Sequence, residues 1–231
     1  MKLDIFEDSA DNEESMHQVR FQKNHPFFQV LFWGSLWGLT EASLGHFLHL
    51  MRVPGLAGFF MFPVGLFCMI RTFRTVGKTS AIPAVAAVAA SLKLVDLFLP
   101  GTQIFQAVNP ALAILAESMA LLFIMKFLKH PEGIFRFRNI LAATLGWRII
   151  YVAFQISLAA AFSETTNFLH LGDAAILRFF LFDSLGNLFL IVGTVHLYKT
   201  AKLPRFISPL SLRPGMVLVL FLAAVLTNIL F

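Results

Sequence analysis

Ionisable and amide side chains recur inside the most apolar stretches of this chain of 231 residues. A charged group surrounded by hydrocarbon is costly, so each of these residues is a candidate for binding a ligand or an ion. Glu41 is the leading candidate, because it is acidic and lies deep within the first apolar run. The full set of candidate substrate-binding residues comprises Glu41, His46, His49, Lys93, Asp96, Asn109, Glu117, Asp183 and Asn187.

Part of this set has the chemistry of a metal site. The carboxylate of Glu41 and the imidazoles of His46 and His49 are suitable ligands for several divalent metals, and His170 in a later connection could join them. Their spacing of five and then three residues is weak evidence, so neither a metal nor another cofactor is assigned. The sequence has no H-E-x-x-H motif, phosphate-binding loop or nucleophile motif, and we therefore predict no catalytic residue.

The candidates carry more negative than positive charge. The acids that could reach the same region as Glu41 are Asp96, Glu117 and Asp183. They outnumber the cations that could pair with them, Lys93 and Arg178. The set favours a cation, an amine or a hydrogen-bonding heterocycle over an anionic solute.

The composition shows what kind of element must position these residues. Hydrophobic residues make up 58% of the chain and charged residues 13%, whereas a soluble domain averages about 25% charged residues. We therefore predict an integral membrane protein in contact with the lipid bilayer. The net charge of +5 resides mostly in short connections between apolar runs, so it does not indicate a nucleic-acid partner.

The apolar residues form runs long enough to cross a bilayer as helices. We predict an all-α, polytopic membrane helix bundle with about seven transmembrane helices, or six if one of the short second and seventh runs does not span. Residues 1–26 are predicted to be a flexible polar tail, and residues 27–231 a single transmembrane domain. The runs are 27–50, 55–70, 79–99, 107–128, 139–162, 174–198 and 214–231.

Basic residues between the runs indicate an orientation. Fourteen Lys and Arg residues lie in the tail and in alternate connections, whereas the remaining connections contain only Arg52. Since cytoplasmic loops are enriched in Lys and Arg, the N-terminus is predicted to be cytoplasmic and Phe231 to be outside. Most candidate residues then fall in the outer half of the bilayer, which favours a water-accessible pocket open to the outside. The fourteen residues are Lys2, Arg20, Lys23, Arg71, Arg74, Lys78, Lys126, Lys129, Arg136, Arg138, Lys199, Lys202, Arg205 and Arg213.

One face of the first run combines small residues with the leading candidates. At about 100° per residue, the residues from Gly34 to His49 that share this face cover an arc of about 140°. The Gly34-x-x-x-Gly38 step allows another helix to approach closely, so this face is predicted to meet protein. The bulky residues opposite are predicted to meet lipid. The small and polar face consists of Gly34, Gly38, Glu41, Ala42, Gly45, His46 and His49, and the bulky face of Phe32, Trp33, Leu36, Leu44 and Phe47.

These features resemble the substrate-binding S components of energy-coupling factor transporters. The similar stretches are the small-residue face from Gly34 to Ala42, Lys93-Leu-Val-Asp96, and Val108-Asn109-Pro110-Ala111 continuing to Glu117. The resemblance implies a subunit of the bacterial cytoplasmic membrane that captures a small molecule or ion from outside. It also implies that the small residues dock onto a transmembrane coupling protein, which works with ATPases.

Two other functions are compatible with the same residues. An intramembrane enzyme, possibly metal-dependent, would use Glu41, His46 and His49. A structural or assembly subunit would use its buried charges only to pair helices, with Lys93 and Asp96 neutralising each other three residues apart and Arg148 paired with Glu117 or Asp183. A binding subunit without turnover is favoured over an enzyme.

Overall fold

A computed structural model describes residues 25–51, 56–128, 131–162, 172–200 and 212–230. Every element among these residues is helical and none is a strand, which confirms the all-α prediction. The elements are α2 (Pro26–Thr40), η1 (Glu41–Gly45), α3 (His46–Leu50), α4 (Leu56–Val76), α5 (Ala81–Leu94), η2 (Val95–Phe98), α6 (Ile104–Phe127), η3 (Pro131–Phe135), α7 (Phe137–Phe162), α8 (Gly172–Leu177), η5 (Arg178–Phe182), α9 (Asp183–Thr200) and α10 (Pro214–Leu230).

Among the residues that the structure describes, five helices are long and apolar enough to cross a bilayer, which indicates an integral membrane protein. α10 is apolar but shorter than these five, and the first run changes from an α-helix to a π-helical turn at Glu41. The count of seven spans therefore stays a prediction. Nearly all of the predicted tail lies outside the described residues. The five are Leu56–Val76, Ala81–Phe98, Ile104–Phe127, Phe137–Ala160 and Gly172–Leu197.

The second run is longer than the sequence suggested. We predicted that it ends at residue 70, but α4 continues to Val76. Arg71 does not end the helix because its side chain is buried, with the guanidinium 5.5 Å from the centre of the Trp33 ring. A cation over an indole face is partly stabilised without water, so the helix can extend past a charged residue.

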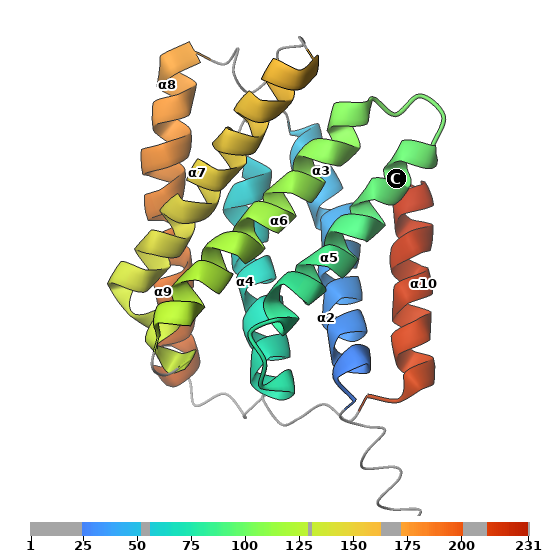
Figure 1. Cartoon of the computed structure of the whole chain (residues 1–231), viewed down its shortest axis with the longest axis horizontal. Helices are drawn as coiled ribbons and strands as arrows, with labels where there is room; N and C mark the ends of the chain where they lie inside the picture. Colours follow the sequence, from blue (N-terminus) through green and yellow to red (C-terminus); the bar gives the residue numbers. More distant parts are fainter. Residues whose placement is uncertain (1–24, 52–55, 129–130, 163–171, 201–211, 231) are drawn as a thin grey trace, which may run out of the picture.

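Successive helices run in alternating directions between the two ends of the bundle (Figure 1). α2 packs against α5, α4 and α10, while α6 packs between α5 and α7, and α9 closes the other side against α7 and α4. Protein therefore covers α2 on several sides.

The small-residue face of α2 packs against α5 as predicted. A Cβ atom on Gly34 would lie 2.6 Å from Val88 Cβ, and one on Gly38 would lie 2.6 Å from Leu92 Cδ1. Ala42, further along the same face, is also buried. The helices are therefore as close as a GxxxG step permits.

The prediction that the opposite face meets lipid was wrong for part of that face. Trp33 is buried and its ring contacts that of Phe67 on α4 at a centroid distance of 5.6 Å, while Phe32 and Leu36 pack against the core. Only the outer part of this face, including Leu44 and Phe47, is exposed. The sequence indicates that one other helix packs against α2, on its small-residue face. In the structure, α4 as well as α5 packs against this helix.

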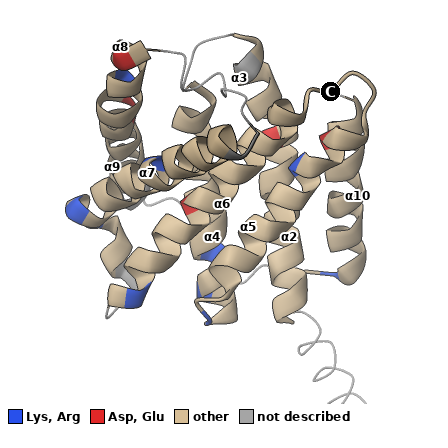
Figure 2. Ribbon diagram, turned by 45° about the horizontal axis from the view of Figure 1, so that its top comes forward, with Lys and Arg blue, Asp and Glu red and all other residues tan. Residues whose placement is uncertain are grey.

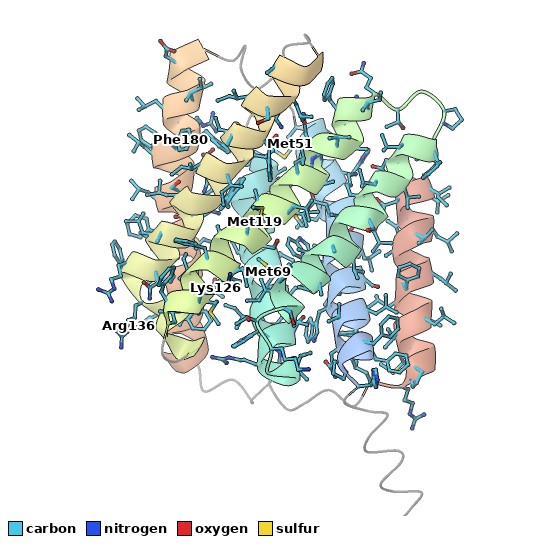
Figure 3. The ribbon with its side chains drawn as sticks, viewed as in Figure 1. Met51, Met69, Met119, Lys126, Arg136 and Phe180 are labelled. Carbon is cyan, nitrogen blue, oxygen red and sulfur yellow. The ribbon has the colours of Figure 1, made fainter. Side chains whose placement is uncertain are left out.

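Basic residues from the connections gather at one end of the bundle, as Figure 2 shows in its lower half. Figure 3 shows the side chains of Lys126 and Arg136 at this end. The alternation on which the orientation prediction depends is thus present in the fold. Its direction across the membrane stays a prediction.

Cysteine labelling tests this direction. In a Cys68→Ala background, we expect Gln103→Cys to react with a membrane-impermeant maleimide in intact cells and Lys78→Cys to react only after permeabilisation. Both positions are exposed and lie at opposite ends of the bundle, so access depends only on orientation. Labelling of Lys78→Cys in intact cells would show that the orientation is the reverse of the predicted one.

Candidate functional site

Trp37 on α2 and Glu117 on α6 meet at a notch in α4. The notch exists because residue 65 is glycine: a Cβ atom there would lie 2.8 Å from both Trp37 Cε2 and Glu117 Oε2. Trp37 is fully buried and Glu117 is 3% exposed. Three helices that are distant in sequence therefore place an indole and a carboxylate against the same point.

Glu41 lies one helical turn further along α2, in a local π-helical turn. The backbone N–H of His46 donates to the carbonyl of Glu41, five residues earlier, in place of the usual four. Insertions of this kind are frequent at functional sites. The Glu41 carboxyl group lies against Gly45, where a Cβ atom would be 3.2 Å from Glu41 Cδ and Oε1.

The charges of Glu41 and Glu117 interact across the bundle. The two carboxylates repel each other, while Lys93 attracts Glu41 and Arg148 attracts Glu117. Neither cation forms a close pair with them: the ion pairs found among the described residues join other groups. We call Trp37, Glu41, Gly65 and Glu117 the central polar site.

Lys93 and Asp96 form the pair that their spacing predicts. The Lys93 ammonium lies 2.6 Å from Asp96 Oδ2, at the junction of α5 and η2. Both side chains are largely buried, so the ion pair is strong and Asp96 neutralises the positive charge of Lys93. These two predicted site residues are thus each other's partners.

Arg148 and Asn187 form a second group, and the pairing of Arg148 with Glu117 or Asp183 that a structural subunit could use is not among the ion pairs of the described residues. Arg148 Nη2 donates to Asn187 Oδ1 at 2.7 Å and Nη1 donates to the Thr144 carbonyl at 2.7 Å. Glu117 and Asp183 attract the guanidinium only from a distance. Arg148 was outside the predicted set, although its charge in the middle of an apolar run was a usable signal.

Asn187 also donates a hydrogen bond to a backbone carbonyl of α4 that lacks its helical partner. Pro63 has no N–H, so the carbonyl of Phe59, four residues earlier, lacks its helical partner. The side-chain amide of Asn187 donates to this carbonyl. Asn187 therefore joins α9 to α4 and to α7, and its predicted part in binding a solute stays a prediction.

Asp183 is close to Arg178, one of the two cations that the sequence offered as partners for the acids. Residues 178–182 form another π-helical turn, closed by the Asp183 N–H donating to the Arg178 carbonyl. This turn brings residues five apart into line, and Arg178 Nε lies 4.0 Å from Asp183 Oδ1.

Asn109 belongs to a third polar contact, between α6 and α7. Its Oδ1 accepts a hydrogen bond from Gln155 Nε2 at 2.9 Å, which links α6 to α7. Gln155 is fully buried and was missed. An amide in an apolar run carries no charge, so only its partner reveals its role.

The predicted histidine cluster is described only in part. His46 begins α3 and is partly buried, while the His49 side chain and His170 lie outside the described residues. Among the residues that the structure describes, no three His, Cys, Asp or Glu side chains lie close enough to hold a metal.

Several buried polar atoms near the central polar site have no hydrogen-bond partner within the described part of the chain. They include Trp37 Nε1 and Glu117 Oε2. Leaving such an atom unpaired costs about 1–3 kcal/mol. The site thus retains one donor and one acceptor for a group that none of the described residues supplies.

The pocket open to the outside stays a prediction, and the described candidate residues lie in several contacts. Glu41 is 6% and Glu117 3% exposed, so both carboxylates are enclosed, and the other predicted residues divide among separate contacts. Comparison of the chain with protein-family models, curated proteins and solved structures gives no match. Function must therefore be argued from these side chains.

Proposed function

We propose that this protein binds a small solute at the central polar site, as the solute-binding subunit of a membrane transporter. The observation that carries the proposal is the pair of unpartnered atoms, Trp37 Nε1 and Glu117 Oε2, on either side of Gly65. A bound solute would supply an acceptor to the first and a donor to the second. The enclosed arrangement described above corresponds to a closed form of the site.

Features of the backbone support a transport role. Carboxylates in the interior of a membrane bundle commonly mark substrate or ion pathways. Two irregularities flank the central polar site, the π-helical turn at Glu41 and Pro63 in α4. Interrupted helices around a site near the middle of the membrane are typical of transporters, because they allow local rearrangement.

The proposed setting is the bacterial cytoplasmic membrane, with a coupling protein and ATPases as partners, as the resemblance to S components implies. One part of that resemblance needs correction. The Gly34–Ala42 face is covered by α5 of the same chain, so it is not free to dock a coupling protein. A partner would have to contact another surface of the bundle.

A structural or assembly subunit is the second candidate, and a specific observation favours it. The Lys93–Asp96 pair and the hydrogen bonds from Arg148 to Asn187 and Thr144 are internally satisfied and join helices. These contacts need no ligand. The two candidates predict different results at Glu117. In a purely structural subunit, no solute would bind at Glu117 and stabilise the protein.

Thermal-shift measurements on the purified protein with vitamins, amines and divalent metals test the proposal. A solute present at about 100 times its dissociation constant stabilises the folded state by about 2.7 kcal/mol, or roughly 5–10 °C. We expect at least one solute to give such a shift and Glu41→Gln or Glu117→Gln to abolish most of it. Asp173→Asn, at an exposed acid on α8, is the matched control and should leave the shift intact. Equal shifts in all four proteins would show that the central polar site does not bind the solute.

A further inference from the structure

We infer that the solute of the central polar site is a monovalent organic cation, a protonated amine that lies between Glu41 and Glu117 against the indole of Trp37. This inference rests on the proposed function and specifies its substrate class. Three observations support it. They are the charge balance of the bundle interior, the cations that lie over the tryptophan rings, and the number of side chains available to hold a metal ion.

The first observation is the charge balance of the bundle interior. Each cation near the central polar site already has a partner: Lys93 is held by Asp96, and Arg148 by Asn187 and the Thr144 carbonyl. Arg178 is half exposed and lies nearest Asp183. The acids Glu41, Asp96, Glu117 and Asp183 exceed the cations Lys93, Arg148 and Arg178 by one charge. A single positive charge between Glu41 and Glu117 would balance the group and relieve their mutual repulsion.

The second observation concerns the three tryptophans of the chain. Arg71 lies 5.5 Å from the centre of the Trp33 ring, and Arg148 lies 4.5 Å from that of Trp147. Within the described residues, Trp37 has no such cation, although it is fully buried and meets the Glu117 carboxylate at Gly65. Indole is the strongest aromatic binder of cations, so Trp37 offers a surface that the protein's own cations leave unoccupied.

The third observation distinguishes an organic cation from a metal ion. Divalent metals need several oxygen or nitrogen ligands at short distances, and the described residues contain no group of three suitable side chains. An ammonium group needs fewer fixed contacts, because its N–H donors can reach two carboxylates while its carbon atoms contact the indole. The unpartnered Glu117 Oε2 is an acceptor, as such a ligand requires.

Matched pairs of amines and alcohols test the inference. The full chain, purified in nanodiscs, is titrated with n-propylamine and n-propanol and with benzylamine and benzyl alcohol, and binding is followed by calorimetry. In each pair the size is nearly constant while the charge changes. We expect at least one amine to bind tenfold or more tightly than its alcohol. We also expect Glu117→Gln and Trp37→Phe to weaken it tenfold, and Trp33→Phe to leave it unchanged.

The outcomes separate the substrate class from the site itself. If an alcohol binds as tightly as its amine, or if MnCl2 binds and both amines do not, the inference is wrong, but loss of that binding in Glu117→Gln would still support the proposed function. If neither amine binds, the inference is also overturned. If no solute from this set or from the thermal-shift screen depends on Glu41 or Glu117, the proposed function fails as well.

Discussion

Replacing Asn187 with leucine is expected to lower the free energy of unfolding by about 3–5 kcal/mol, the range seen when one partner of a buried charged contact is removed. The substitution leaves the Arg148 guanidinium without the acceptor that holds Nη2. It also leaves the Phe59 carbonyl without the side-chain donor that it has in the native protein. Reversible unfolding in mixed micelles, followed by circular dichroism, measures the loss.

Pro63→Ala provides the control that identifies the cause. Alanine restores a backbone N–H four residues after Phe59, which is the helical partner that proline lacks. In the Asn187→Leu background, Pro63→Ala should therefore recover about 1 kcal/mol. In the native background it should recover less, since Asn187 already occupies the carbonyl. Strictly additive effects in this double-mutant cycle would show that Asn187 does not compensate for Pro63.

Gly34→Leu is expected to be the most damaging glycine substitution in α2, costing about 3 kcal/mol or more. A Cβ atom at Gly34 would lie 2.6 Å from Val88 Cβ and 2.9 Å from the Val85 carbonyl oxygen. These atoms belong to the backbone of α5 or are fixed directly to it, so the two helices must separate. The same unfolding measurement reports the cost.

Two further glycines give a graded comparison. At Gly38 the nearest obstacle is Leu92 Cδ1, the flexible end of a side chain, so Gly38→Leu should cost less than Gly34→Leu. At Gly193 on α9 no atom lies within 4 Å of the position of a Cβ atom, so Gly193→Leu should be mild. All three changes gain the same helix propensity. Equal destabilisation at Gly34 and Gly193 would contradict the close α2–α5 contact.

Local patterns were sufficient to predict several features of this protein. The length and apolarity of the runs determine helices, because a chain in hydrocarbon must satisfy its backbone hydrogen bonds within each segment. The Gly34-x-x-x-Gly38 step determined that α2 makes a close helix contact. Lys93 and Asp96 paired as expected because residues three apart lie on the same side of a helix.

Relationships between helices required the tertiary structure. The periodicity of a helix shows which residues share a face, but not which other helix covers that face. Trp33 was consequently assigned to lipid although α4 covers it, and the pairings considered for Arg148 did not include Asn187, which accepts its hydrogen bond. Local π-helical turns at Glu41 and Arg178 also shift the phase of the residues that follow them.

The sequence by itself determined that Glu41 and Glu117 are buried acids in a helical membrane bundle, since their position in apolar runs leaves no alternative environment. Only the tertiary structure decided that Glu117 meets Trp37 at Gly65, while the nearby cations are held by other partners. The physical reason is that burial depends on the composition of one segment. A hydrogen bond or ion pair depends on the distance between two segments, and that distance is fixed by the packing of every helix in the bundle.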